Sequence, residues 1–311
     1  MLQATFDCYL VHFVKNKQLK PSSFRDGGFF YYLALVEETF TIKTIIAMSG
    51  GMKRGPISYY GGKVNLAKKI VGMIPQHITY VEPFCGGAAV FWAKEPSGVE
   101  IVNDTNKELV NFYVQCKVNN EELDRLIKGS IHSRDLHRDA WVVYNHPHLF
   151  SDVRRAWAVW VLANMGFSSQ LAVSFGTNIK SDVQSKKIAN KRDSFGASFA
   201  KRLERVTAES KDAVDVIDQY DTEDSFHYCD PPYFNSDCAH YKGYSESDFR
   251  RLLDKLAMVK GKFLLSSYPS AVLQEYIDRY GWKHEQIDGR VSVARVKTSK
   301  KSKTECLTWN Y

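Results

Sequence analysis

The spacing of hydrophobic residues changes repeatedly between helical and strand-like periods from residue 59 onward. Apolar residues at i, i+3, i+4 and i+7 predict an amphipathic helix through Leu109, Phe112, Tyr113 and Cys116. Before it, the pattern predicts a helix over 63–74, a strand over 79–84, a helix over 88–94 and a strand over 100–103. Strands that alternate with helices are typical of a parallel sheet covered by helices.

The alternation stops between residues 117 and 205. This stretch combines an apolar helix around Trp157 and Trp160 with polar loops that contain glycine. Its last part, residues 178–206, carries eight Lys or Arg against three Asp or Glu. We therefore predict a separate insertion with a basic face.

The α/β pattern returns after residue 205. It predicts strands over 206–209, 226–229 and 262–266 and helices through 249–256 and 273–280. Alternation over 291–296 and 304–310 predicts a closing antiparallel hairpin, whose connection is basic and includes Lys300 and Lys301.

These patterns divide the chain into three parts. An α/β domain comprises residues 53–116 and 206–311, and the insertion comprises residues 117–205. Residues 1–52 form an N-terminal extension of uncertain role, either two or three strands or sequence upstream of the true start.

Composition narrows the class of protein. The 311 residues are 44% apolar, enough for a large α/β domain with an insertion, and no run of 18 apolar residues predicts a membrane span. The net charge of +7 suits a polyanionic partner. None of the six cysteines forms a CxxC pair or has a histidine at zinc-ligand spacing, so we expect free thiols, a reducing compartment such as the cytoplasm, and no metal.

The strongest chemical signal is Asp230-Pro231-Pro232-Tyr233, directly after the strand predicted over 226–229. Ligands bind beyond the carboxyl ends of strands in open α/β sheets. The prolines stiffen the turn and leave their carbonyls available, Asp230 adds a carboxylate, and Tyr233 adds an aromatic face. Together they predict a pocket that accepts hydrogen bonds from an amino group and stacks a planar ring.

Two further motifs follow the first two strands of the α/β pattern. Glu82-Pro83-Phe84-Cys85-Gly86-Gly87 is a strand that runs into a glycine turn, where the backbone can approach a ligand closely. Asp104 follows the next strand, where a carboxylate can accept hydrogen bonds from ribose hydroxyls or else cap a helix. There is neither a GxGxxG sequence nor a P-loop.

A fourth motif, Tyr59-Tyr60-Gly61-Gly62-Lys63, precedes the first helix. Lys63 can reach a carboxylate or a phosphate, and Tyr59 can pack over a cofactor. The alternative is a solvated lysine at a helix start, which the helix dipole slightly disfavours.

In this order the motifs resemble the Dam-type (D12-class) adenine-N6 DNA methyltransferases. That family has a YxGGK-like segment, an EPFxGG-like turn, an acidic second-strand motif and DPPY, with a recognition domain inserted before DPPY. The tail from Glu305 to Tyr311 is similar to its closing ExLxxNY strand. The resemblance covers residues 59–311, and the first 50 residues have no counterpart.

The resemblance implies a seven-stranded Rossmann-like sheet that binds S-adenosylmethionine, releases S-adenosylhomocysteine and uses no metal. It implies that Asp230, Pro231, Pro232 and Tyr233 meet a flipped-out adenine in duplex DNA. The residues that it places around the cofactor are Tyr59, Lys63, Glu82, Pro83, Phe84, Gly86, Asp104, Phe226 and Asp230.

The insertion is then a mainly helical target-recognition domain. We expect DNA contacts from basic and amide side chains, namely Arg134, Arg138, Asn164, Ser168, Asn178, Lys186, Lys187 and Arg192, together with Lys300 and Lys301 of the hairpin. Expected partners are double-stranded DNA and, in a restriction–modification system, a cognate endonuclease; we expect a monomer or weak dimer encoded by a bacterium or phage.

Two other functions stay open. An RNA adenine-N6 methyltransferase would recognise single strands or RNA shape, and a DNA-binding module without activity would bind cofactor and transfer no methyl group. Aspartate at the first motif position argues against cytosine-N4 and protein-glutamine methylation, where Ser-Pro-Pro-Tyr and Asn-Pro-Pro-Tyr are usual.

Overall fold

The computed structural model describes residues 54–167, 171, 173–235, 243–290 and 302–311, so the N-terminal extension lies outside it. The strands are β1 (Thr79–Glu82), β2 (Val99–Asn103), β3 (Val206–Glu209), β4 (Ser225–Cys229), β5 (Lys262–Ser267), β6 (Lys283–Arg290) and β7 (Ser302–Trp309). The helices are α3 (Ala67–Met73), α4 (Ala89–Ala93), α5 (Lys107–Val118), α6 (Asn120–Lys128), α7 (Arg134–Asn145), α8 (Asp152–Met165), α9 (Val183–Asp193), α10 (Ala197–Arg202), α11 (Ala213–Tyr220), α12 (Glu246–Leu256) and α13 (Ala271–Tyr280), with a 3-10 turn at Pro147–Leu149.

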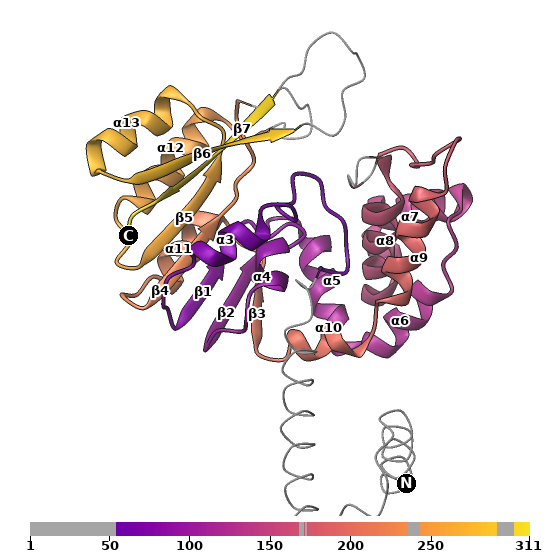
Figure 1. Ribbon diagram of the computed structural model, residues 1–311. Coiled ribbons are helices and arrows are strands. Elements are labelled where there is room, and N and C mark those ends of the chain that lie inside the picture. Colours follow the sequence, from indigo (N-terminus) through magenta and orange to yellow (C-terminus); the bar gives the residue numbers. More distant parts are fainter. Residues whose placement is uncertain (1–53, 168–170, 172, 236–242, 291–301) are drawn as a thin grey trace, which may run out of the picture. The chain divides into compact units, whose positions relative to one another are not determined.

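The strands form one sheet in the order β3-β2-β1-β4-β5-β7-β6 (Figure 1). Strands β1 to β5 are parallel, and β7 runs antiparallel between β5 and β6. The chain moves outward from β1 to β2 and β3, then returns to place β4 on the other side of β1. The carboxyl ends of β1 and β4 therefore flank a topological switch point, the usual ligand site of such sheets.

Both faces of the sheet are covered. Tyr80 of β1 and Tyr228 of β4 belong to the core under α3, α4 and α5. Cys229, the next residue of β4, belongs to a core with α12 and α13, and Val81 of β1 packs with α11. Successive strand residues point to opposite faces, so burial on both faces accounts for the nearly continuous apolar runs in the central strands.

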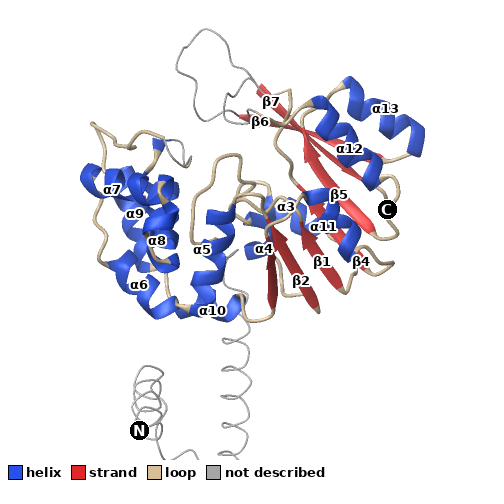
Figure 2. Cartoon of the chain, turned by 180° about the vertical axis from the view of Figure 1, so that it is seen from behind, coloured by secondary structure: helices blue, strands red, loops and turns tan. Residues whose placement is uncertain are grey.

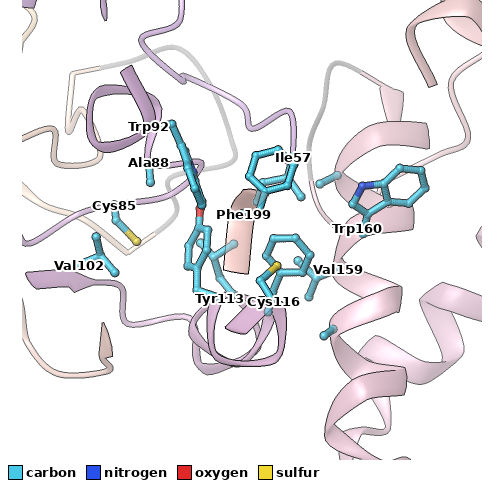
Figure 3. Close-up of a cluster of buried hydrophobic side chains, with 14 of the residues drawn as sticks. Ile57, Cys85, Ala88, Trp92, Val102, Tyr113, Cys116, Val159, Trp160 and Phe199 are labelled. Atoms are coloured by element: carbon cyan, nitrogen blue, oxygen red, sulfur yellow. The ribbon is translucent and has the colours of Figure 1, made fainter. Parts of the chain in front are cut away.

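Between β2 and β3 the chain forms the helices α5 to α10. Figures 1 and 2 show α6 to α9 gathered beside the sheet, with α5 between them and β2. The central helix α8 is buried along almost its whole length. Trp92 of α4, Tyr113 of α5, Phe199 of α10 and Trp160 of α8 belong to one buried cluster, so the helical core is continuous with one face of the sheet (Figure 3).

The hairpin differs from the sequence prediction. Strand β7 is confirmed, but residues 283–290 pair with it, and the predicted partner 291–296 lies outside the described residues. Strand β6 is the edge of the sheet, and Ile287 is its one aliphatic residue. Charged and polar side chains on an edge strand oppose pairing with other molecules, and they also erase the alternation that would reveal the strand.

The first helix is shorter than predicted. It begins at Ala67, and Leu66 caps it without a side-chain hydrogen bond. Residues 59–66 form turns instead, with Gly61 at φ 72°. This keeps Lys63 off the helix and lets it lie at the carboxyl ends of the strands.

Candidate active site

A pocket of about 1040 Å³ opens at the carboxyl ends of the parallel strands. Most of its lining comes from four segments, 59–66, 82–90, 104–106 and 230–233. The structure thus brings together every predicted catalytic and cofactor residue except one.

The exception is Phe226. It lies at the start of β4, where it pairs with Tyr80, and it is fully buried beside the rings of Tyr80, His77 and Tyr311. Because β4 reaches the pocket with its other end, Phe226 does not line the pocket, in contrast to its predicted place beside the cofactor. Tyr228, two residues further along the same face of β4, lines the pocket instead.

Tyr59 lies against the glycine turn. A Cβ atom on Gly86, at φ 47°, would stand 3.0 Å from the Tyr59 ring, and one on Gly87 would stand 2.7 Å from the Tyr59 Cβ atom. The turn ends at Ala88, whose φ of 50° is a conformation that glycine adopts more readily. The two glycines therefore admit Tyr59 as well as leaving the turn open to a ligand.

Asp104 fastens the second strand to the glycine turn. Its carboxylate accepts hydrogen bonds from the backbone N–H groups of Gly86 at 3.0 Å and Asn106 at 2.9 Å. Burial raises the pKa of Asp104, and these two donors oppose the rise. The alternative role as helix cap is excluded, since Asn106 caps α5.

Asn103 holds three strand ends in register. Its fully buried amide donates to the Pro83 carbonyl at 2.8 Å and to the Lys211 carbonyl at 3.1 Å, and its oxygen accepts from Lys211 N–H at 2.9 Å. These bonds join the ends of β1, β2 and β3, which fixes the spacing between the glycine turn and Asp104.

Glu82 is a buried carboxyl at the end of β1. One of its oxygens accepts hydrogen bonds from the Tyr80 hydroxyl at 2.7 Å and the Phe91 N–H at 3.1 Å. Burial raises the pKa of Glu82 to about 8, against the effect of these donors. A cation bound in the pocket would reverse that shift.

Lys63 pairs with Asp230. Its ammonium group lies 2.7 and 2.9 Å from the two carboxylate oxygens of Asp230 and donates to the Gly61 carbonyl at 3.0 Å. Burial lowers the pKa of Lys63, but the charges of Asp230 and Glu305 outweigh burial, so the pKa is raised. Burial raises the pKa of Asp230, while Lys63 and the Tyr233 hydroxyl oppose that rise. Lys63 therefore reaches a carboxylate, one of the two partners predicted for it.

Two site residues were missed by the sequence reasoning. Glu305 of β7 bonds the Tyr233 hydroxyl and lies 3.7 Å from the Lys63 ammonium. The ring of Tyr268, which follows β5, meets the Tyr233 ring edge-on at 4.4 Å between centroids. Glu305 could have been found from its place in the tail motif. Tyr268 could have been found because it directly follows a parallel strand, and the carboxyl ends of such strands form the site.

The predicted DNA contacts have different surroundings. Arg134, Arg138, Asn178 and Lys186 are exposed, although Arg138 pairs with Asp135 and Lys186 pairs with Asp182. Lys187 and Arg192 are half-buried; burial lowers the pKa of Lys187, and Arg192 donates to the Ser130 carbonyl. Ser168, Lys300 and Lys301 lie outside the described residues.

Asn164 is buried, which excludes it from reading bases in this structure. Its side chain on α8 accepts from Ser58 N–H at 3.0 Å and donates to the carbonyls of Trp160 at 3.0 Å and Pro56 at 3.4 Å. Lys191 of α9 donates to the Gly55 carbonyl. The helical segment therefore holds residues 55–58, which lead directly into Tyr59 and Lys63.

No helix in the described part of the chain is long and apolar enough to cross a membrane. Within the same ranges, no group of three or more His, Cys, Asp and Glu side chains is arranged to hold a metal ion. The described cysteines, Cys85, Cys116, Cys229 and Cys306, are buried free thiols.

The sheet order and the pocket at its switch point, beside the turn Asp230-Pro231-Pro232-Tyr233, are those of an α/β protein that binds a ligand at the carboxyl ends of its strands. The model of the D12 class N6 adenine-specific DNA methyltransferase family matches residues 59–286, and the chain belongs to this family. It is accordingly an adenine-specific DNA methyltransferase, dependent on S-adenosylmethionine.

The individual relatives share little sequence identity with this chain. The Type II methyltransferase M1.LlaDCHI of Lactococcus lactis subsp. cremoris is 27% identical over 286 residues, which cover 81% of this chain and 93% of that protein. A precorrin-6y C5,15-methyltransferase structure from Geobacter metallireducens GS-15 has a TM-score of 0.36 at 11% identity, covering 81% of this chain and 92% of that chain. An rRNA methylase structure from Streptococcus thermophilus has a TM-score of 0.34 at 8% identity, with coverage of 81% and 98%.

Proposed function

We propose that this enzyme methylates N6 of an adenine that is flipped out of duplex DNA at a specific sequence. The observation that carries the proposal is the position of Asp230. It lies at the switch point, paired with Lys63 and beside Tyr233, in the same pocket as Asp104 and Glu82.

The cofactor half of the pocket comprises the ends of β1 and β2. S-adenosylmethionine supplies a methyl group on a sulfonium centre, and it carries ribose hydroxyls and a charged amino group. We assign Asp104 to the ribose hydroxyls, since a carboxylate at the end of the second strand suits them. We assign Glu82 to the amino group, with Tyr59 and Phe84 as apolar walls. The donors and acceptors on these residues fit the ligand.

The base half of the pocket is Asp230, the proline carbonyls and Tyr233. The lone pair of adenine N6 is delocalised into the ring, which makes the nitrogen a poor nucleophile. Asp230 and a proline carbonyl accept its two hydrogens and favour a more tetrahedral nitrogen. Positioning and electrostatics then supply most of the acceleration. The proton that N6 loses leaves through Asp230 or passes directly to water.

A flipped base is needed because base pairing and stacking in the duplex block approach to N6 from above or below the ring plane. Extrusion costs a few kcal/mol, and stacking on Tyr233 offsets about 1–3 kcal/mol of it. We propose that the helical segment 117–205 reads the sequence through contacts to base edges, while most of its basic side chains contact phosphates and set its register on the DNA. The similarity to a Type II methyltransferase supports a paired restriction endonuclease as a partner.

The test is transfer of tritiated methyl groups to matched duplex DNA, single-stranded DNA and RNA. We expect label in duplex DNA alone, recovered as N6-methyladenine after digestion. Transfer to RNA instead would favour the RNA alternative, and cofactor binding without transfer to any substrate would favour a non-catalytic module.

Cofactor binding at pH 7 should release protons from Glu82. With a pKa of about 8 the carboxyl is mostly protonated there, and a bound ammonium group lowers that pKa and drives ionisation. We expect about 0.5–0.9 protons released per cofactor, obtained from calorimetry in buffers of different ionisation enthalpy. Glu82→Gln should release almost none, whereas Glu95→Gln, an exposed control, should match wild type. Equal release by Glu82→Gln would contradict the assignment.

DNA affinity should depend on salt through α7. Each phosphate contact that is removed lowers the slope of log affinity against log salt by about 0.9, so Arg134→Gln/Arg138→Gln should lower it by up to about 1.8. Lys260→Gln, an exposed change beyond the amino ends of the strands, is the matched control. An unchanged slope in the double variant would exclude α7 from the DNA interface.

A further inference from the structure

The Tyr233 hydroxyl lies between two carboxyl groups. It is 3.1 Å from an oxygen of Asp230 and within hydrogen-bonding distance of Glu305. A phenol has one hydrogen, so it donates to one of these oxygens only. The second contact is a hydrogen bond only when that carboxyl is itself protonated and donates to the phenol oxygen.

Lys63 distinguishes the two carboxyl groups. Its ammonium group makes two hydrogen bonds to Asp230, at 2.7 and 2.9 Å, but stands 3.7 Å from Glu305. Opposite charge at hydrogen-bonding distance favours the ionised form of Asp230. Glu305 receives less of this compensation, although its side chain is only 15% exposed. Of the two carboxyl groups, Glu305 is therefore the better placed to hold a proton.

We propose that Glu305 is a positioning residue that acts in its protonated form, donating to the Tyr233 oxygen and directing the phenol hydrogen to Asp230. Asp230 then receives hydrogen bonds from both Lys63 and Tyr233, and it stays ionised to accept the N6 hydrogen. This inference rests on the proposed role of Asp230 and Tyr233 in methylation.

The pKa of Glu305 is shifted in the direction that this proposal requires. Burial raises its pKa; the Lys63 charge and the Tyr233 hydrogen bond oppose the rise, while the Asp230 charge adds to it. The other titratable neighbours are Tyr228 of β4 and Cys306 of β7. When Glu305 ionises, two carboxylates compete for one phenol hydrogen, and the added negative charge opposes ionisation of Asp230.

The test compares Glu305→Gln with Glu305→Ala in the full chain, using kcat at saturating cofactor and duplex DNA between about pH 6 and pH 9. The wild-type kcat should fall on the alkaline side as Glu305 ionises. Glutamine keeps an N–H donor toward Tyr233 and does not titrate, so Glu305→Gln should lose this alkaline fall. Glu305→Ala should lower kcat by about tenfold to a hundredfold while KM for DNA changes less than about threefold. Glu305→Gln should restore most of the difference.

The matched control is Glu285→Gln, which changes an exposed carboxyl of the neighbouring strand β6 that pairs with Lys69. It should reproduce the wild-type pH profile. An alkaline fall that persists in Glu305→Gln, or a glutamine variant no better than alanine, would overturn the proposal for Glu305. Absence of methyl transfer by the wild-type enzyme would instead refute the proposed function, so the two failures are distinguishable.

Discussion

Replacing Asp230 with alanine should lower kcat for adenine methylation by about 10³-fold or more. The loss combines removal of the acceptor for N6 with an unpaired Lys63 ammonium group in a buried site, because Asp230 accepts both of its short ion-pair contacts. Binding of cofactor and of duplex DNA should change little, since Asp104, Glu82 and the exposed basic residues are untouched. Single-turnover methyl transfer and DNA binding, measured on the same preparation, check both expectations.

Two further variants sharpen the Asp230 test. Asp230→Asn keeps the shape and one acceptor oxygen but turns an N–H donor toward the pocket, so it should be nearly as inactive as alanine. Asp215→Asn, an exposed change on α11, should behave as wild type. Substantial turnover by Asp230→Ala would remove the observation on which the proposed function rests.

Lys63→Met should lower activity at pH 7 by about a hundredfold, and part of this loss should disappear as the pH is raised. Burial raises the pKa of Asp230, and Lys63 is the main group that opposes the rise. Without Lys63 the pKa of Asp230 climbs further, so the carboxyl is protonated at neutral pH and cannot accept the N6 hydrogen. A carboxyl whose pKa lies two units above the pH is ionised in only about one hundredth of the molecules.

The sign of the pH effect identifies the cause. The active form of Asp230 is ionised. The activity of Lys63→Met, relative to that of wild type, should therefore increase as the pH rises past the raised pKa of Asp230. Lys68→Met, an exposed change on α3, is the control with the same chemical substitution. A loss that is equally deep at every pH would mean that Lys63 acts on cofactor or DNA and not through the protonation of Asp230.

The local parts of the site could be predicted from the sequence. Asp230, Asp104 and the glycine turn each follow a strand that carries a clear apolar run, and parallel strands bring their carboxyl ends to one edge. This does not extend to Phe226, because about four strand residues, or roughly 13 Å, separate it from Asp230 along β4. A residue at the start of a parallel strand lies at the amino-end edge of the sheet, opposite the edge that carries the pocket.

The remaining errors came from contacts between distant segments. Glu305 enters the site only because β7 inserts between β5 and β6, and no periodic pattern reveals that pairing. The residues of β6 are almost all polar because it is an edge strand, so its pattern resembled a loop. Asn164 looked like a base-reading amide, and only its tertiary contacts with Ser58 and Pro56 show where the amide is used.

The bonds from Asn164 and Lys191 to residues 55–58 bear on any exchange of the helices that we propose to read DNA. Grafting the helices of a relative between β2 and β3 would remove both anchors of the segment that leads to Tyr59 and Lys63. A chimera made at residues 117 and 205 alone would carry new helices on a protein in which residues 55–58 have lost these bonds. A working exchange must therefore take residues 55–58 and the helices from the same relative, although the two segments are separate in the sequence.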